Sequence, residues 1–259
     1  MQLQGRSALV TGAANGIGRA IALGMAEAGA DVAAADLDKA NVSTLKAEIE
    51  ALGRKCLAIE ADAGDVEAID AMISQTVEVF GKLDIIVNNA GVTRRAHIMD
   101  LTEEDFDKIN RVNAKGVFFC MQRAATEMIK NGGGRIINIA SIAGKGFAGS
   151  SNVIYAGTKG AVISMTRLAS VQLGPHNINV NAVCPGVTET AIYDEIMISD
   201  AAKLGIPEAE VRARALEKIP LRRGNTPKDI ADMCVFLASD AARNVSGQSL
   251  HVDGALVPD

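Results

Sequence analysis

The sequence predicts one α/β domain built on a doubly wound parallel sheet, and three features of the 259-residue chain indicate this fold. Short apolar runs alternate with amphipathic stretches from one end to the other, which is typical of repeated βαβ units. The short runs are apolar throughout, which favours parallel strands buried on both faces. No linker, repeat or low-complexity tract interrupts the alternation, so we expect residues 1–259 to form a single domain.

Six strands are expected, and each is a short run of β-branched or small residues that ends in a turn signal. They lie at residues 7–12, 31–36, 55–62, 83–91, 134–141 and 177–186. Residues 65–80 place apolar side chains at three- and four-residue steps, which predicts a helix with one apolar face. Thr102 with Asp105 predicts a capping box, and Thr226 with Pro227 predicts the start of a later helix.

Composition and charge argue against several classes of protein. The hydrophobic fraction of 48% and the charged fraction of 22% are those of a soluble globular chain. The net charge is −5, and the scattered Lys and Arg residues do not form the basic cluster that a nucleic-acid surface needs. No apolar run is long enough to span a bilayer, and the N-terminus lacks the layout of a signal peptide. We therefore expect a cytoplasmic protein without nucleic-acid or membrane partners.

The cysteines and histidines are too scattered to predict a metal site or a disulfide. Their spacing matches no zinc-binding pattern and includes no CxxC pair. We expect no metal ion and interpret the cysteines as core residues. The residues concerned are Cys56, Cys120, Cys184, Cys234, His97, His176 and His251.

A glycine-rich turn after the first strand, TGAANGIG, indicates a dinucleotide site. Gly12, Gly16 and Gly18 stand before an apolar helix, where they would let a pyrophosphate approach backbone N–H groups at the helix N-terminus. The spacing differs from GxGxxG, and by itself it also fits a tight turn between strand and helix. Asp36 ends the second strand, about where a carboxylate would bond the adenosine ribose hydroxyls. The glycine-rich turn and the carboxylate at the end of the next strand together favour the dinucleotide site.

Tyr155 and Lys159 lie one helical turn apart in the stretch NVIYAGTKGAV, in a chain with two tyrosines and no tryptophan. Such an i, i+4 pair is common on surface helices, so by itself it does not define a site. Ser141, at the end of a strand just upstream, adds a third polar group. A nearby ammonium and a positively charged cofactor both favour a phenolate, so we expect the pKa of Tyr155 to fall from about 10 toward neutrality.

Five motifs in this order make the chain resemble the short-chain dehydrogenase/reductase family. They are TGAANGIG, NNAG at residues 88–91, Ser141 after IINIA, YAGTK, and PG at residues 185–186, and VDG at residues 252–254 also fits. The resemblance runs from about residue 5 to the C-terminus. It implies a Rossmann-type domain with a seven-stranded parallel sheet, normally in a homotetramer or homodimer. The implied chemistry is reversible hydride transfer between a nicotinamide cofactor and an alcohol or carbonyl carbon.

The resemblance also implies roles for individual residues. Tyr155 would be the acid/base, and Lys159 would hold the nicotinamide ribose and favour the phenolate. Ser141 would orient the substrate oxygen, and Asn113 would hold a water that relays protons from Lys159. The implied cofactor-binding residues are Gly12, Asn15, Gly16, Ile17, Gly18, Asp36, Asp62, Asn89, Ala90, Gly91, Tyr155, Lys159, Pro185, Gly186 and Thr188.

Among these cofactor-binding residues, the carboxylate at the end of the second strand predicts NAD as the cofactor. Asp36 would repel the additional phosphate of NADP and accept bonds from a ribose diol instead. Asn15 stands where phosphate-binding relatives often carry a basic residue. Asp62 would meet the adenine, and Thr188 would touch the nicotinamide carboxamide.

The family's pocket wall corresponds to Ala143 and Asn152, beside Ser141 and Tyr155, and a segment from residue 187 to about residue 215 would close over it. A small alanine and an amide that both donates and accepts hydrogen bonds favour a small polyhydroxylated secondary alcohol, such as a sugar, polyol or diol. Asn152 could equally point to solvent, because the interval from Ser141 to Tyr155 is one residue longer than is common in the family.

The alternative reading is a 3-oxoacyl carrier-protein reductase, because GVTRRAHIM after NNAG resembles that subfamily. Those enzymes usually prefer the phosphorylated cofactor, which the acidic end of the second strand disfavours. Arg94 or Arg95 near the pocket mouth would suit an anionic substrate, or both could be solvated surface residues. A regulator that kept the fold and lost catalysis would be expected to lack Ser141, Tyr155 or Lys159, and all three are present.

Overall fold

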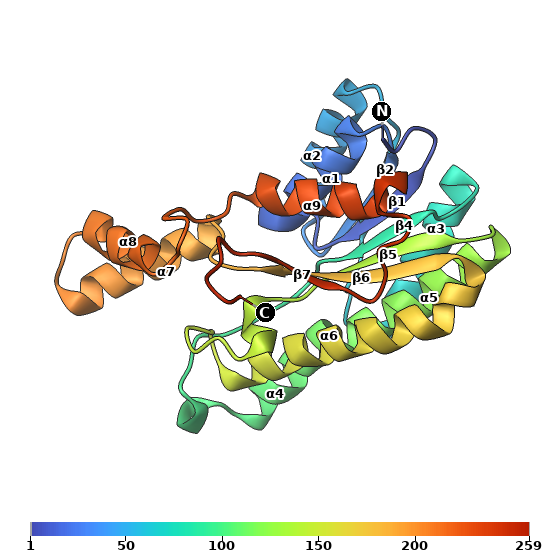
Figure 1. The fold of residues 1–259 in the computed structure, drawn as a ribbon. Helices are drawn as coiled ribbons and strands as arrows, with labels where there is room; N and C mark the ends of the chain where they lie inside the picture. Colours follow the sequence, from blue (N-terminus) through green and yellow to red (C-terminus); the bar gives the residue numbers. More distant parts are fainter. Residues whose placement is uncertain (1, 259) are drawn as a thin grey trace.

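The computed structural model describes residues 2–258, which form one parallel sheet with helices on both faces (Figure 1). The sheet order is β3-β2-β1-β4-β5-β6-β7, and each neighbouring pair is parallel. This confirms the predicted doubly wound fold with seven strands. The strands are β1 (Ser7–Thr11), β2 (Asp31–Asp36), β3 (Cys56–Glu60), β4 (Ile85–Asn88), β5 (Gly134–Ile139), β6 (Ile178–Pro185) and β7 (Ser249–Val252).

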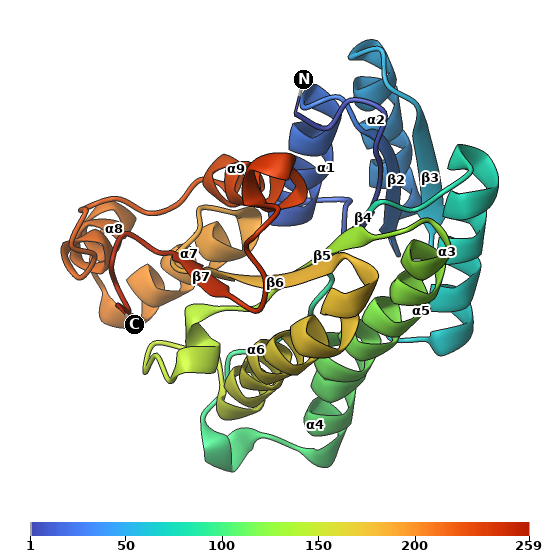
Figure 2. The ribbon, with the colours of Figure 1, turned by 45° about the vertical axis from the view of Figure 1, so that its right-hand side comes forward.

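The helices divide into two layers. Figures 1 and 2 show α1, α2 and α9 over one face of the sheet and α3, α5 and α6 over the other. The α-helices are α1 (Gly16–Glu27), α2 (Lys39–Ala51), α3 (Val66–Phe80), α4 (Glu103–Asn110), α5 (Val117–Lys130), α6 (Val153–Leu173), α7 (Ala191–Leu204), α8 (Glu208–Glu217) and α9 (Pro227–Ala238). A π-helical segment, η2 (Arg111–Gly116), joins α4 to α5, and short 3₁₀ segments are η1 (Ile98–Asp100), η3 (Ile142–Lys145), η4 (Gly174–His176) and η5 (Asp240–Ala242).

Alternating residues of the central strands build the two hydrophobic cores. Ala8 and Val10 of β1 pack in the core beneath α1 and α9, whereas Leu9 packs in the core beneath α3 and α5. All three are fully buried. Successive side chains of a strand point to opposite faces, so a strand covered on both faces must be apolar at every position.

The helix N-caps predicted from the sequence are confirmed at the starts of α4 and α9. Thr102 accepts from the N–H of Asp105 while the Asp105 carboxylate accepts from the N–H of Thr102, a complete capping box at α4. Thr226 caps α9 in the same way, with Asp229 in the third helical position and Pro227 in the first turn. The seventh strand, β7, was not among the six strands expected from the apolar runs, because it is a four-residue edge strand with only half-buried side chains.

Three buried polar side chains join the middle of the sheet to α6. Asn88 of β4 donates its amide to Asn138 of β5 at 2.8 Å, and Asn138 donates to the hydroxyl of Thr166 on α6 at 2.9 Å. All three are at most 2% exposed. Because buried polar groups are costly unless they are paired, this chain of bonds favours one position of α6 on the sheet.

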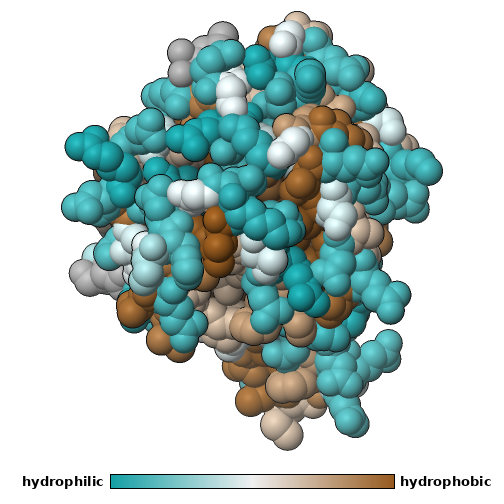
Figure 3. Space-filling view, turned by 90° about the vertical axis from the view of Figure 1, so that its right-hand side faces the viewer, coloured by the Kyte–Doolittle hydropathy of each residue, from teal (hydrophilic) through white to brown (hydrophobic). Residues whose placement is uncertain are grey.

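The two ends of the sheet differ. Figure 3 shows the end that lies at the right of Figure 1, where hydrophilic side chains cover most of the surface and apolar groups form short streaks between them. At the opposite, carboxyl end of the strands, α7 and α8 project beyond the sheet (Figure 1). Among the helices of residues 2–258, none has both the length and the apolar character needed to cross a membrane.

Candidate active site

The glycine-rich turn follows β1 at the point where the strand order reverses between β1 and β4. Gly12 has a φ of +65°, and a Cβ built there would lie 2.8 Å from the Cα of Ala90. A Cβ built on Gly18 would lie 2.0 Å from the carbonyl oxygen of Gly12. Both positions therefore need glycine, and the turn they allow brings the start of α1 against the end of β4, an arrangement that suits a pyrophosphate.

The NNAG motif holds this turn in place. The side chain of Asn89 donates to the carbonyls of Thr11 and Gly12, each at 3.0 Å. The hydroxyl of Thr11 accepts in return from the N–H groups of Asn89 and Ala90, each at 3.1 Å. The structure thus gives Asn89 a positioning role on the glycine turn, and its predicted contact with the cofactor stays a prediction.

Asp36 lies beside the same turn. One carboxylate oxygen accepts from the N–H of Ala14 and the other from the N–H of Asp38, both at 3.0 Å. Each oxygen keeps a second lone pair that a ribose hydroxyl could use. Asn15 bonds the side chain of Asn41 at 3.4 Å at the start of α2. The predicted cofactor-binding groups of β1 and β2 are therefore adjacent.

Asp62, predicted to meet the adenine, is paired with an arginine that the sequence did not single out. It accepts from the guanidinium of Arg111 at 2.7 Å and from the N–H of Gly64 at 2.8 Å. Partial burial acts to raise the pKa of Asp62, but these two bonds outweigh it and hold the pKa below its usual value. Asp62 is thus a fixed carboxylate at the end of β3, and its contact with the adenine stays a prediction.

Asn113 is fully buried within the π-helical segment η2. Its amide accepts from the N–H of Val92 at 2.8 Å and donates to the carbonyl of Val92 at 2.9 Å. A Cβ built on Gly91 would lie 3.4 Å from the Asn113 oxygen and 3.6 Å from the Lys159 ammonium, so both side chains flank Gly91. The structure brings Asn113 and Lys159 together as expected, and the relay water remains a prediction.

Ser141 and Tyr155 meet across the mouth of the site. Ser141 caps η3, where its hydroxyl accepts from the N–H of Ala143 at 3.1 Å, and it shares a hydrogen bond with the hydroxyl of Tyr155. Burial raises the pKa of Tyr155, and the bond with Ser141 opposes this increase only in part. Among the protein's own groups, desolvation of the phenolate therefore dominates, and the decrease expected from Lys159 together with a positively charged cofactor stays a prediction.

Lys159 is 3% exposed, and its ammonium donates to the carbonyl of Ile139 at 2.7 Å. It lies 5.7 Å from the centre of the Tyr155 ring. Burial lowers the pKa of Lys159 to about 8, with a smaller opposing effect from Cys184. Gly144 makes this close packing possible, because a Cβ there would lie 2.6 Å from the carbonyl carbon of Lys159. The sequence analysis did not identify Gly144 or the Ile139 carbonyl.

Asn152 has a structural role that the sequence analysis did not predict, and its contact with a substrate stays a prediction. Its oxygen accepts from the N–H of Tyr155 at 2.7 Å and so caps α6. Its amide donates to the carbonyl of Arg94 at 2.6 Å and to the hydroxyl of Thr93 at 3.2 Å. At 5% exposure it points neither to solvent nor freely into a pocket, and one oxygen lone pair is all that a substrate could use. Ala143 is buried within η3.

The PG and VDG motifs pack against each other after β6. A Cβ on Gly186 would lie 2.6 Å from the Cβ of Asp253, so this contact requires glycine. The hydroxyl of Thr188 donates to the carbonyl of Gly186 at 3.2 Å. A Cβ on Gly16 would lie 3.5 Å from the methyl group of Thr190. Residues 185–190 therefore lie beside the glycine turn, where Pro185, Gly186 and Thr188 were predicted.

The two arginines after NNAG make different ion pairs. Arg94 binds both carboxylate oxygens of Asp105 on α4, at 2.8 and 2.6 Å. Arg95 binds both carboxylate oxygens of Asp200 on α7, at 3.0 and 2.8 Å. Both guanidinium groups are exposed surface groups held in ion pairs, and neither partner was predicted.

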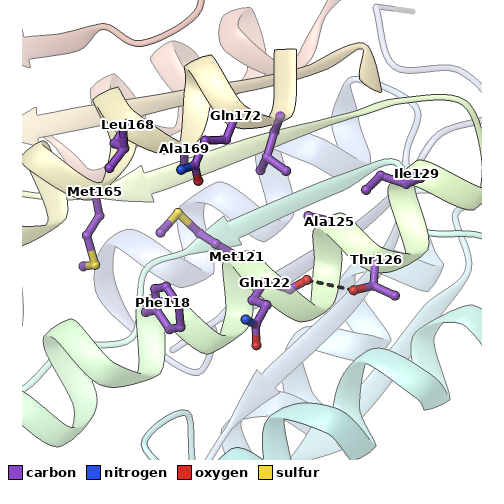
Figure 4. A pocket seen from close by; sticks show the side chains of 11 residues that line it. Phe118, Met121, Gln122, Ala125, Thr126, Ile129, Met165, Leu168, Ala169 and Gln172 are labelled. Carbon is purple, nitrogen blue, oxygen red and sulfur yellow. Dashed lines mark hydrogen bonds between the residues drawn. The ribbon is translucent and has the colours of Figure 1, made fainter. Parts of the chain in front are cut away.

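A separate apolar cavity of about 340 Å³ lies between α5 and α6, and Figure 4 shows its side chains. It includes none of the predicted catalytic or cofactor residues. It is lined by Phe118, Met121, Gln122, Ala125, Thr126, Ile129, Met165, Leu168, Ala169, Gln172 and Leu173. Within residues 2–258, no three His, Cys, Asp or Glu side chains gather closely enough to hold a metal ion.

Comparisons with known proteins agree with this arrangement. Residues 12–256 match the family model described as enoyl-(acyl carrier protein) reductase. A solved short-chain type dehydrogenase/reductase of Mycobacterium marinum is 34% identical, with a TM-score of 0.90 over 100% of this chain and 98% of the other. The chain belongs to the short-chain dehydrogenase/reductase family and is an oxidoreductase of alcohol and carbonyl groups with a nicotinamide cofactor.

Two curated relatives have more specific names. The 3-oxoacyl-[acyl-carrier-protein] reductase FabG of Thermotoga maritima is 40% identical, over 99% of this chain and 100% of the relative. The (2S)-[(R)-hydroxy(phenyl)methyl]succinyl-CoA dehydrogenase subunit BbsD of Thauera aromatica is also 40% identical, over 98% of this chain and 97% of the relative.

We predict that Tyr155→Phe lowers kcat by about 100-fold or more, because it removes the proton donor and acceptor and keeps the ring. Binding of the reduced cofactor, followed by its fluorescence, should change little. Tyr193→Phe is the matched control, since Tyr193 is the second of the two tyrosines, and it should keep kcat within the same order of magnitude. Near-normal turnover of Tyr155→Phe would show that another group transfers the proton.

The lowered pKa of Lys159 predicts a pH-dependent cost in stability. Its pKa falls from 10.5 to about 8 on folding, so the unfolded chain binds this proton more tightly and stability rises with pH across that window. Lys159→Met removes a cost of roughly 3 kcal/mol that is present below pH 8.

Urea unfolding of wild type and Lys159→Met at several pH values measures this cost. The stability advantage of the variant should shrink as pH rises from about 8 to about 10.5, and Cys56, Cys120 and Cys234 contribute equally to both chains. A stability difference that stays constant with pH would mean that folding does not lower the pKa of Lys159.

Proposed function

We propose that the chain interconverts a 3-hydroxyacyl thioester and the corresponding 3-oxoacyl thioester with NAD(H). The observation that carries the reaction type is the Ser141–Tyr155 hydrogen bond beside the buried Lys159. The support for the substrate comes from the two curated relatives. Their names describe a 3-oxoacyl thioester on a carrier protein and an acyl-CoA with a hydroxyl on the third carbon, so the reacting carbon lies β to a thioester in both.

The site fits a dinucleotide through features of this chain. The glycine turn has no room for a Cβ at Gly12 or Gly18, and it leads into the N-terminus of α1, where backbone N–H groups would bind phosphate oxygens. Asp36 is held by two N–H groups and keeps lone pairs for a ribose diol. Bound there, the nicotinamide would accept or return the hydride of the substrate carbon.

The chain's own residues handle the proton. In the oxidation direction, the Tyr155 phenolate would take the proton of the substrate O–H group, the electron pair of that bond would form the C=O group, and the C3 hydride would leave to the nicotinamide. Ser141 holds the substrate oxygen and the Tyr155 oxygen close together. Lys159 keeps a positive charge near the phenolate, and Asn113 would hold the water that connects Lys159 to solvent. Because burial alone raises the pKa of Tyr155, the positive nicotinamide must supply most of the decrease that catalysis needs.

The sugar or polyol substrate is the weaker proposal. It relied on the Asn152 amide to bind substrate hydroxyls at the pocket wall. That amide instead donates to the carbonyl of Arg94 and to the hydroxyl of Thr93. Without that amide, nothing else that we identified in the pocket wall selects a polyhydroxylated substrate.

The cofactor proposal rests on the charge at the end of β2. Asp36 would face the 2′-phosphate of NADP, the next residue is the exposed Leu37, and Lys39 is paired with Glu60 at 3.3 Å. No guanidinium or free ammonium from this turn is therefore positioned to bind a second phosphate, and NAD is favoured.

We further infer a homotetramer, and the face formed by α5 and α6 supports association of copies. Phe118 and Leu168, which line the cavity in Figure 4, are 42% and 62% exposed, and Val171 of α6 is 71% exposed. Large exposed apolar patches are typical of protein interfaces. Light scattering should give the mass of four chains, and Leu168→Glu should lower that mass. A monomeric wild-type protein would contradict this inference.

We predict that kcat/KM with NAD exceeds kcat/KM with NADP by about ten-fold or more, which corresponds to about 1.4 kcal/mol. Asp36→Asn keeps the shape of the side chain and an acceptor for a backbone N–H while it removes the charge. It should reduce this preference by improving use of NADP. Equal or better use of NADP by the wild type would contradict the cofactor assignment.

The substrate is tested by absorbance of the reduced cofactor across a panel of alcohols. We expect 3-hydroxybutyryl-CoA to be oxidised with a kcat/KM at least about ten-fold above that of any sugar, polyol or diol, a difference of about 1.4 kcal/mol. Free 3-hydroxybutyrate is the matched control that lacks the thioester. A polyol that reacts faster than the thioester would contradict this proposal and favour the sugar, polyol or diol substrate expected from the sequence.

A further inference from the structure

Residues 187–217, here called the α7–α8 segment, are tied to the body at their base. Val187 accepts from the N–H of Asn225 at 2.8 Å, and Glu189 donates its N–H to the carbonyl of Asn225 at 2.8 Å. Beyond this base, α7 and α8 project from the carboxyl end of the sheet (Figures 1 and 2). The base therefore fixes where the segment starts, and other contacts must set where its far part lies.

The far part has little hydrophobic anchoring. Met197 and Val211 are the large apolar side chains of α7 and α8 that are buried among those described, whereas Ile198 and Leu204 are 56% and 60% exposed. Elements with few buried apolar contacts open at low free energy. Polar contacts thus have a larger share in holding this segment than they have elsewhere in the fold.

An arginine joins α7 and α8 to each other. Arg212 of α8 donates to Asp194 of α7 at 2.7 Å and to Glu208 at 2.8 Å, and its guanidinium lies 5.3 Å from the centre of the Tyr193 ring. These contacts favour movement of the two helices as one unit.

The Arg95–Asp200 pair joins this unit to the loop after β4. The two residues are 105 positions apart in the sequence, and Asp200 is 21% exposed. The loop itself is fixed to the start of the catalytic helix, because Ala96 donates its N–H to the carbonyl of Ser151 at 3.1 Å and Arg94 accepts from Asn152 at 2.6 Å. The pair therefore connects α7 to the residues directly before Tyr155.

We propose that Arg95 and Asp200 are positioning residues that latch the α7–α8 segment over the substrate end of the site. The latch takes no part in the chemistry. It retains the substrate by holding α7 against the same loop that bonds Asn152, the N-cap of the helix of Tyr155 and Lys159. It applies to whichever alcohol the site oxidises, so it does not rest on the thioester assignment.

Amide hydrogen exchange of residues 191–217 tests the latch without any substrate. Arg95→Gln and Asp200→Asn should each speed this exchange by about five-fold, the scale expected for a well-aligned exposed pair. Arg94→Gln is the control, because Arg94 is adjacent and also contacts both oxygens of one carboxylate, but that carboxylate lies on α4, so this exchange should be unchanged. The double variant Arg95→Asp with Asp200→Arg should return exchange toward wild type.

Unchanged exchange in Arg95→Gln, or equal acceleration by Arg94→Gln, would overturn the latch. Kinetics with any substrate that is turned over then separate a latch from an anion-binding arginine. A latch predicts that Arg95→Gln and Asp200→Asn both raise KM by about five-fold with kcat maintained. If Arg95 instead bound a substrate anion, Asp200→Asn would release it and lower KM, and that result would also overturn the proposal.

Discussion

The site depends on one hydrogen bond, which the buried ammonium group of Lys159 donates to the backbone carbonyl of Ile139. Lys159 can donate to Ile139 only because η3 and α6 pack closely at Gly144 and because α6 is held in register on the sheet. The Asn138–Thr166 bond supplies that register from the residue next to Ile139. A buried charge costs several kcal/mol when its partner is lost, so the surrounding packing must be firm.

The loop after β4 links the parts of the site that are distant in the sequence. Asn89 binds the glycine turn, Val92 binds Asn113, and the carbonyl of Arg94 binds the cap of α6. Arg95 extends the same loop to α7. One stretch of extended chain therefore couples the cofactor turn, the π-helical segment and the catalytic helix, and a shift of this loop would disturb all three.

The fold and the placement of Tyr155 and Lys159 on one helix could be predicted because they depend on local patterns. Apolar runs located six of the seven strands, and the spacing of Tyr155 and Lys159 placed them on one helix. The ion pairs of Arg95 and Arg111 depend on long-range geometry, which residue spacing does not report. The N-cap role of Asn152 was not predicted, because a polar residue just before a helix caps it as readily as it lines a pocket. The increase in the pKa of Tyr155 in the protein alone was not predicted, because it depends on burial, which residue spacing does not report.

The central claim is that a buried Tyr155 becomes an effective base only when a positive charge joins Lys159 beside it. The chain has two tyrosines, so Tyr193→Phe leaves Tyr155 as the single phenol, and its ultraviolet titration reports one pKa. The account predicts a pKa above the usual value of 10 for the protein alone. Saturating NAD should lower this pKa by about two units or more, and reduced cofactor should not. A pKa that NAD leaves unchanged would contradict the account.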